Sequence, residues 1–115
     1  REDFIVGIKN ISATDPYLVG HFPDQPIYPG VLLIETCAQV GGILVGRLFE
    51  GRGVLAQVKN FKFLHFIEPG DTIRVEAKYV GKLGPFAQVT VEAFVNEKRV
   101  AKGEVSHSFI KKNSN

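Results

Sequence analysis

The stretch VLLIETCAQVGGILVGRLF, residues 31–49, decides how this chain folds. Apolar residues dominate it and no proline interrupts it, which predicts one long helix from about residue 31 to residue 49. Three glycines, Gly41, Gly42 and Gly46, each cost such a helix on the order of 1 kcal/mol relative to alanine. Burial must offset that loss, so we expect the helix to pack closely against another part of the chain.

The rest of the chain is dominated by strand patterns. Gly51 and Gly53 are expected to end the helix, and later segments alternate between apolar and polar residues. We expect five strands, at residues 4–8, 54–66, 72–80, 86–96 and 100–110. The last four of these strands are expected to form an antiparallel meander after the helix. The sequence therefore predicts an α+β fold in which an antiparallel sheet wraps around one long central helix.

Length and composition narrow the class of protein. The chain has 115 residues, which suits a single domain spanning residues 1–115, and 44% of them are hydrophobic, enough for a core. A net charge of +2 is too small to indicate a nucleic-acid partner, and a single cysteine suits a reducing compartment. No uninterrupted apolar run indicates a membrane span, and the first residues lack the plan of a signal peptide. We therefore expect a cytoplasmic protein.

Glu35 places a carboxyl group in the second turn of an otherwise apolar helix. A helix that is apolar nearly all round is buried. Burial of a carboxylate without a cation favours the protonated acid, which can donate a proton near neutral pH. Gln39 lies one turn further along the same face and can orient that carboxyl group. The pattern leaves one alternative open, in which Glu35 emerges at the edge of the helix into solvent.

His21 supplies a complementary base ahead of the helix, because its imidazole titrates near neutrality. Pro23, Pro26 and Pro29 stiffen the loop that follows it. Gly30, where this loop meets the helix, brings backbone N–H groups and the positive helix end to the same neighbourhood. Such donors can stabilise the charge that develops on a thioester carbonyl oxygen when the neighbouring carbon loses a proton. The set predicts acid–base chemistry on an acyl thioester.

The stretch LVGHFPDQPIYPGVLLIETCAQVGG, residues 18–42, closely resembles the signature of the (3R)-hydroxyacyl-[acyl-carrier-protein] dehydratases of the FabZ type. That family's pattern runs G-H-F-P-x-x-P-x-x-P-G-V-L-x-x-E-x-x-A-Q, and the resemblance continues through residues 58–80 into the final strands. It implies a hot-dog fold, with the sheet wrapped around the long helix, and a hydro-lyase that needs no metal or redox cofactor. The matching positions are Gly20, His21, Phe22, Pro23, Pro26, Pro29, Gly30, Val31, Leu32, Glu35, Ala38 and Gln39.

The resemblance also implies a role for each site residue. His21 of one subunit would take the proton at C2 of the acyl chain, and Glu35 of its dimer partner would protonate the departing C3 hydroxyl. The backbone N–H of Gly30 or Val31 would hold the thioester carbonyl, and Gln39 would steady Glu35. The substrate would be a (3R)-3-hydroxyacyl chain on the phosphopantetheine arm of acyl carrier protein, and the product a trans-2-enoyl thioester in fatty acid biosynthesis. The assembly would be a homodimer or a trimer of dimers.

Two other functions are compatible with the same fold. A hot-dog thioesterase would also use a helix carboxylate, but it does not need the proline-rich frame that follows His21. A non-catalytic module that binds acyl thioesters could dispense with His21 or Glu35, and both residues are present. Dehydration therefore remains the function that uses all of these residues.

The remaining reactive side chains are assigned to packing or to the surface. Cys37 is expected to be a small core residue. His107 alternates with Val105 and Phe109, which predicts a half-buried position in a sheet. Neither His107 nor His65 has a carboxylate or cysteine at the spacing of a metal site, so we expect no bound metal.

Overall fold

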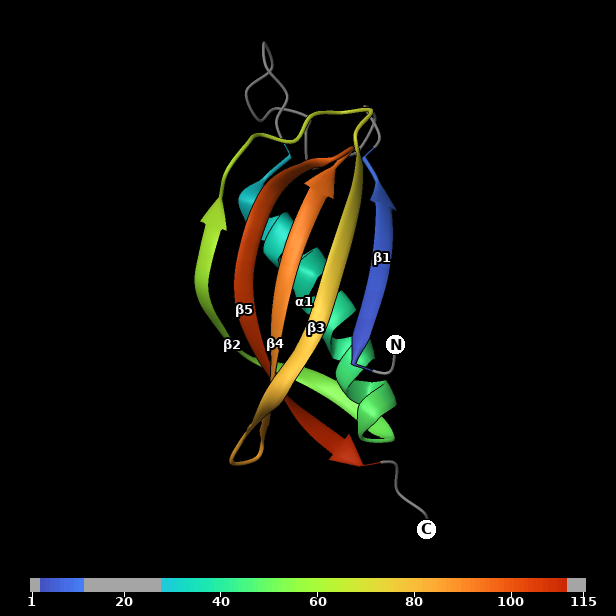
Figure 1. Ribbon diagram of the computed structural model, residues 1–115, viewed down its shortest axis with the longest axis vertical. Coiled ribbons are helices and arrows are strands. Elements are labelled where there is room, and N and C mark those ends of the chain that lie inside the picture. Colours follow the sequence, from blue (N-terminus) through green and yellow to red (C-terminus); the bar gives the residue numbers. More distant parts are fainter. Residues whose placement is uncertain (1–2, 12–27, 112–115) are drawn as a thin grey trace.

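The computed structural model of the protein describes residues 3–11 and 28–111 (Figure 1). The helix and all five strands that the sequence predicts lie within these ranges, with bounds that shift by a few residues. In chain order the elements are β1 (Phe4–Asn10), α1 (Gly30–Leu48), β2 (Gly51–Phe63), β3 (Thr72–Leu83), β4 (Phe86–Val95) and β5 (Lys98–Lys111).

The strands form one antiparallel sheet in the order β1-β3-β4-β5-β2. The strands β3, β4 and β5 follow one another as a meander, as expected. The expected place of β2 is wrong, because β2 pairs with β5 at the far edge and β1 takes the free edge of β3. Residues 64–71 carry the chain across the end of the sheet from β2 to β3 (Figure 1).

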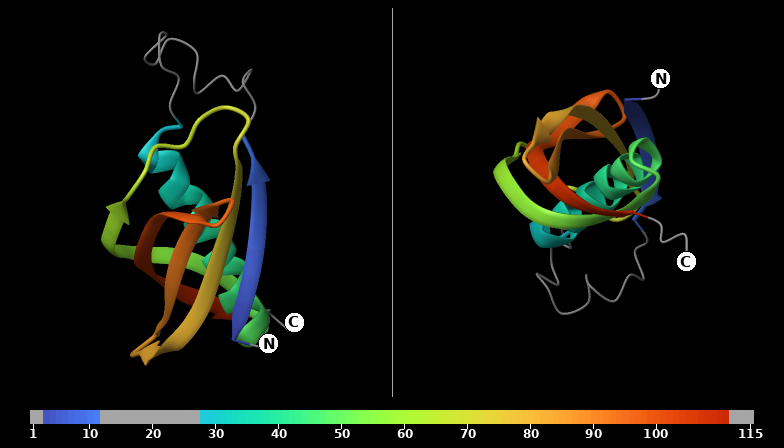
Figure 2. Two further views of the ribbon diagram at one scale, coloured as in Figure 1. Left: turned by 45° about the horizontal axis from the view of Figure 1, so that its top comes forward. Right: turned by 90° about the horizontal axis from the view of Figure 1, so that it is seen from below.

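The sheet curls around α1, which lies along its concave face (Figure 2). The helix contacts all five strands. This is the α+β arrangement that the sequence pattern predicts and the hot-dog fold that the family resemblance implies, with one side of the helix covered by the sheet and the other side left open.

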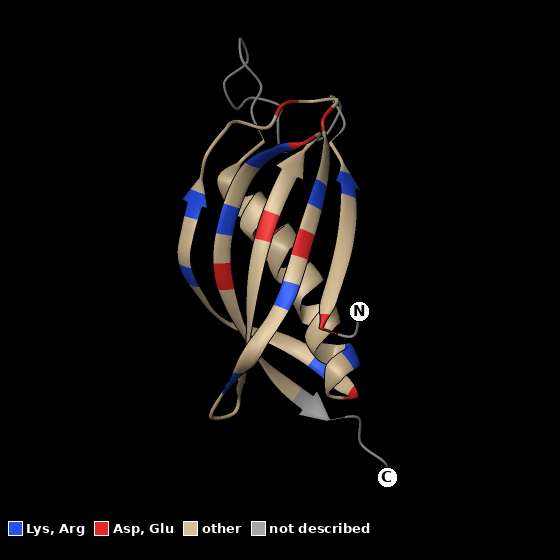
Figure 3. Ribbon diagram, viewed as in Figure 1, with Lys and Arg blue, Asp and Glu red and all other residues tan. Residues whose placement is uncertain are grey.

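Side chains along the strands alternate between the core and the outer face. On β3, Ile73, Val75 and Ala77 are fully buried against the helix side. Arg74 and Glu76 lie between them on the outer face, partly exposed, with 3.0 Å between Nε and Oε2. Charged residues recur along the neighbouring strands in the same way (Figure 3). The predicted alternation of this strand is confirmed, and it fixes which face the helix can cover.

The helix approaches β2 so closely that backbone meets backbone. A Cβ atom on Gly46 would lie 2.8 Å from the carbonyl oxygen of Gly51, and one on Gly53 would lie 2.6 Å from that of Gly42. Side chains cannot occupy such contacts, because packed carbon and oxygen atoms lie well over 3 Å apart. The expectation that the helix glycines mark close packing is confirmed.

The chain reverses direction at Glu50, between α1 and β2. This residue has φ of 50°, the left-handed conformation that often follows the end of a helix. Gly51 is already the first residue of β2, and Gly53 lies within the same strand. The expectation that these two glycines end the helix is therefore wrong, because Glu50 makes the turn and the glycines serve the helix–strand contact.

By length and composition alone, α1 is apolar enough to cross a membrane. The apolar side chains on its covered side, including Leu33, Leu44 and Val45, are fully buried against the sheet. The core of the fold therefore accounts for them. Polar residues spaced along α1 interrupt its apolar sequence. The sequence therefore contains no uninterrupted apolar run that would indicate a membrane span, although α1 is apolar on average.

Gly46→Ala is expected to lower the free energy of unfolding by about 1–3 kcal/mol, because the added methyl group overlaps a backbone oxygen that has no freedom to move away. Gly42→Ala is the matched control in the same helix, since its Cβ would lie 3.4 Å from the nearest atoms, at the edge of ordinary contact. Urea denaturation followed by circular dichroism measures both variants. Equal stability of the two would contradict this description of the contact.

Candidate active site

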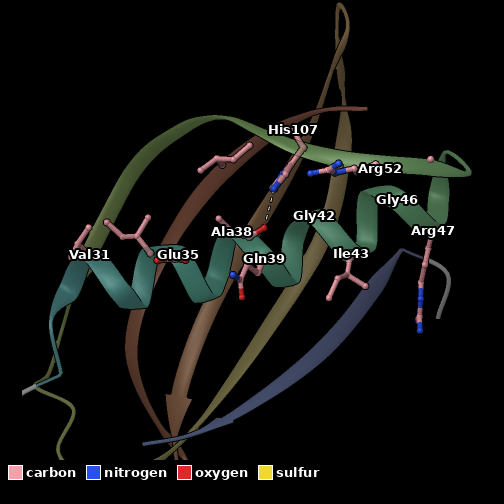
Figure 4. Close-up of a pocket in the computed structure, with 14 residues that line it drawn as sticks. Val31, Glu35, Ala38, Gln39, Gly42, Ile43, Gly46, Arg47, Arg52 and His107 are labelled. Carbon is pink, nitrogen blue, oxygen red and sulfur yellow. Dashed lines mark hydrogen bonds between the residues drawn. The ribbon is translucent and has the colours of Figure 1, made fainter. Parts of the chain in front are cut away.

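The sheet leaves one stripe of α1 exposed, at every fourth residue. The stripe consists of Val31, Glu35, Gln39, Ile43 and Arg47. All five residues line a groove between α1 and β2 whose volume is about 990 Å³ (Figure 4). This groove is the candidate active site, because it contains both the helix carboxyl group and the amide that the sequence singles out.

The floor of the groove is built largely from backbone. Gly42 and Gly46 of α1 and Gly51 and Gly53 of β2 all line it. These are the residues that bring helix and strand into direct contact, and none of them carries a side chain that could fill the space above. The close approach of α1 to β2 therefore also leaves the groove open.

Glu35 is exposed in the groove, so its expected burial is wrong for the single chain. The sheet covers α1 on one side only, and the position of Glu35 falls on the open side. Of the two alternatives, emergence at the helix edge is the one observed. Gln39 lies one turn further along the same exposed stripe, so the groove brings the expected acid and its expected neighbour together (Figure 4).

The first turn of α1 begins at the same end of the groove as Glu35. Pro29 precedes the helix in an extended conformation, and its carbonyl oxygen accepts a hydrogen bond from the N–H of Leu33 at 3.3 Å. The N–H groups of Gly30 and Val31 come before the first helical hydrogen bonds, as the first amides of any helix do. Val31 and Glu35 both line the groove, so the first turn of α1, whose amides are expected to hold the thioester carbonyl oxygen, lies at the same end as the expected acid.

Two contacts fix the start of the helix. A Cβ atom on Gly30 would lie 2.9 Å from Cε1 of Phe63, so this position admits a side chain only if the ring moves. The N–H of Tyr28 donates to the carbonyl oxygen of Ile67 at 2.8 Å, which ties the helix start to the connection between β2 and β3. His21, the expected base, lies outside the described residues.

His107 also lines the groove. The sequence predicts that it lies in a sheet but not that it is fully buried. It is 1% exposed rather than half-buried, and its Nε2–H donates to the carbonyl oxygen of Ala38 at 2.9 Å (Figure 4). The ring packs on Gly41 and Gly42, and Nδ1 has no partner among the described residues. Burial lowers the pKa of His107, and the hydrogen bond to Ala38 opposes this in part. The neutral imidazole is therefore favoured.

Cys37 is a core residue, as expected. It is fully buried, and burial raises the pKa of its thiol to about 12. The thiolate that a nucleophile requires is therefore strongly disfavoured. Within the described ranges, no group of three His, Cys, Asp or Glu side chains is placed to hold a metal ion.

Residues 2–104 match the family model described as the FabA-like domain. The chain belongs to the FabA-like family. Within this family it is 40% identical over 111 residues to the 3-hydroxyacyl-[acyl-carrier-protein] dehydratase FabZ of Ruminiclostridium cellulolyticum, covering 93% of this chain and 78% of the relative. It is 41% identical over 104 residues to the dehydratase of the same name from Thermotoga maritima, covering 90% of this chain and 76% of the relative.

Solved structures share the fold of this FabA-like chain at low sequence identity. The dehydratase heterocomplex ApeI:P from Xenorhabdus doucetiae matches with a TM-score of 0.75 at 18% identity, over 94% of this chain and 89% of that one. A hypothetical thioesterase from Streptococcus pneumoniae, solved with coenzyme A, matches with a TM-score of 0.80 at 18% identity, over 99% of this chain and 84% of that one. At such identities the likeness establishes the hot-dog fold alone.

The buried His107 of this FabA-like chain is expected to make its stability depend on pH. Its pKa is lowered from the ordinary value of 6.5 in the folded state, so the unfolded chain binds more protons than the folded chain below about pH 6.5. The stability that this neutral residue provides is present above about pH 6.5. It is lost as the pH falls from there toward the lowered pKa of the folded state.

Urea denaturation at about pH 7.5 and about pH 5.5 measures this loss, with His107→Gln as the comparison. Glutamine keeps an N–H donor for the carbonyl oxygen of Ala38 but does not titrate. Other ionisable groups contribute equally to both proteins, so the acid-induced loss should be smaller in the variant. An identical loss in the two proteins would show that His107 is not responsible.

Proposed function

We propose that this protein is a 3-hydroxyacyl-[acyl-carrier-protein] dehydratase, which converts (3R)-3-hydroxyacyl thioesters to trans-2-enoyl thioesters and water in fatty acid biosynthesis. The observation that carries the proposal is Glu35, which lies in an open groove on the helix of a chain 40% identical over most of its length to a FabZ dehydratase. A carboxyl group, an amide and helix N-terminal amides share that groove, a set suited to acid–base chemistry on a thioester.

The elimination needs a base at C2 and an acid at C3. In the proposed reaction the imidazole of His21 takes the proton from C2, and the electrons of that C–H bond form the double bond between C2 and C3. The bond between C3 and its oxygen breaks, and the hydroxyl group leaves as water with the proton of Glu35. His21 is then protonated and Glu35 ionised, and proton exchange with solvent restores both residues.

The other groove residues would stabilise charge on the thioester carbonyl oxygen and orient the carboxyl group of Glu35. Negative charge develops on the thioester carbonyl oxygen as C2 loses its proton, and the N–H of Gly30 or Val31 would donate a hydrogen bond to that oxygen. Both groups lie at the positive end of α1, whose dipole favours an anion. Gln39, one turn beyond Glu35, would orient the carboxyl group through its side-chain amide.

The assembly we propose is a homodimer that shares its active sites, with His21 of one copy acting on the same substrate as Glu35 of the other. The exposed stripe of α1 supports this arrangement, because Val31 and Ile43 on it are 71% and 55% exposed. Apolar residues beside an open groove are typical of a surface that a second chain covers. The resemblance to FabZ dehydratases extends this to a trimer of dimers, acyl carrier protein as the partner that delivers the substrate, and a cytoplasmic location.

Hydrolysis of an acyl thioester is the second candidate function. It rests on fold likeness to proteins described as thioesterases and an acyl-CoA hydrolase, at 15–18% identity. Dehydratases match this chain at 37–41% identity, which favours elimination over hydrolysis.

Glu35→Gln and His21→Ala are each expected to lower the rate of dehydration by about 100- to 10,000-fold, the range typical of a lost general acid or base. The substrate is a (3R)-3-hydroxyacyl chain on acyl carrier protein, and the conjugated enoyl product is followed by absorbance and mass. Glu97→Gln is the matched control, because Glu97 is exposed at the turn between β4 and β5, outside the groove.

A parallel assay for free thiol separates the two functions. Enoyl product without free thiol is the expected result for the parent protein. Release of free thiol without enoyl product would assign the protein to hydrolysis, and full activity of Glu35→Gln would remove Glu35 from the chemistry.

A further inference from the structure

The charged residues of the groove are separated along its length. Glu35 lies toward the N-terminal end of α1, whereas Arg47 is in the last turn of α1 and Arg52 follows at the start of β2. Between them the described lining is mainly apolar or glycine, with Gln39 and the neutral His107 as its polar members. Arg47 is twelve positions after Glu35 in the helix, which places its backbone about 18 Å further along the helix axis. The groove therefore has an acidic end and a cationic end.

Arg52 is the cation that extends over the groove. Figure 4 shows its guanidinium group reaching from β2 in the direction of His107, while Arg47 points away on the other side of α1. Within the described part of the chain, ion pairs join Arg74 to Glu76 and Arg99 to Glu92, and neither Arg47 nor Arg52 takes part in one. Glu50 lies in the turn between the two arginines, but within the described residues no ion pair joins it to either of them.

A guanidinium group in such a place is suited to an oxyanion. Its planar fork of N–H donors matches the two oxygens of a carboxylate or phosphate, and partial enclosure in a groove strengthens the pairing relative to open solvent. Exposed arginines on an ordinary surface bind little, because solvent and salt screen them. Arg52 is also exposed, but it lines the same groove as the proposed catalytic carboxyl group.

We propose that Arg52 binds an anionic group of the thioester substrate while the reacting carbons lie beside Glu35. This inference rests on the proposed function, because it takes the groove to hold the substrate. The shared chemistry is an oxyanion within reach of the Arg52 guanidinium. Two parts of a substrate can supply it: the phosphate of the phosphopantetheine arm, or a carboxylate at the far end of the acyl chain.

Three thioesters distinguish the two sources. The first carries a plain 3-hydroxyacyl chain on N-acetylcysteamine and has neither anion. The second carries the same chain on 4′-phosphopantetheine, and the third carries a chain with a terminal carboxylate on N-acetylcysteamine. Each is assayed with the parent protein, Arg52→Gln and Arg52→Lys. Arg99→Gln is the matched control, because Arg99 is an exposed arginine paired with Glu92 outside the groove.

Arg52→Gln is expected to raise KM about 10-fold for one of the two anionic thioesters, with kcat and the neutral thioester little changed. Arg52→Lys should recover part of the loss, since it restores the charge without the fork. Loss confined to the phosphopantetheine thioester assigns the anion to the arm, and loss confined to the carboxylated chain assigns it to the acyl group. Equal effects on all three thioesters, or none, would overturn the proposal.

Equilibrium binding keeps this test separate from the proposed reaction. Thioethers of the same three kinds, in which a saturated alkyl chain without a hydroxyl group replaces the 3-hydroxyacyl group, cannot lose water. Calorimetry measures their affinity directly. Weaker binding of an anionic thioether to Arg52→Gln would support the anion site even if the parent protein dehydrated none of the thioesters. In that event the proposed function would fail and the anion site would stand.

Discussion

The contact between α1 and the edge strand β2 is the constraint on which the rest of the structure depends. Glycines meet across it backbone to backbone, at distances that leave no room for a methyl group. This holds the helix at the edge of the sheet, with its apolar side on the concave face and the stripe from Val31 to Arg47 on the open side. The same glycines form the floor of the groove, so one packing feature both fixes the helix and creates the candidate site.

That geometry explains how a carboxyl group is accommodated on the central helix of a small protein. In the single chain Glu35 remains in contact with water, so the fold does not bear the cost of burying a charge without a partner. A second copy that covered the stripe would change the surroundings of Glu35 without changing the fold beneath it. In the account proposed here the fold places the acid, and the assembly supplies the base and the enclosure that the reaction needs.

The sequence predicts the elements and the inner face of the sheet, because both depend on local periodicity. The position of β2 depends instead on which edge of the sheet is free. Strand patterns do not show which of the strands pairs with which edge. The burial of Glu35 is mispredicted for a related reason, since the apolar content of a helix does not reveal how far a sheet wraps around it. His107 could have been placed more fully, because its alternation with the buried Val105 already assigns it to the inner face. No pattern identified Arg52 as a groove residue.

Mixing two inactive variants shows whether the dehydratase site is built from two copies of the chain. His21→Ala and Glu35→Gln are unfolded together in equal amounts, refolded, and assayed for dehydration. If each site takes its histidine and its glutamate from different copies, random pairing restores about a quarter of the parental activity, since half of the dimers then hold one intact site. Folded, dimeric mixtures that remain as inactive as the separate variants would contradict the account.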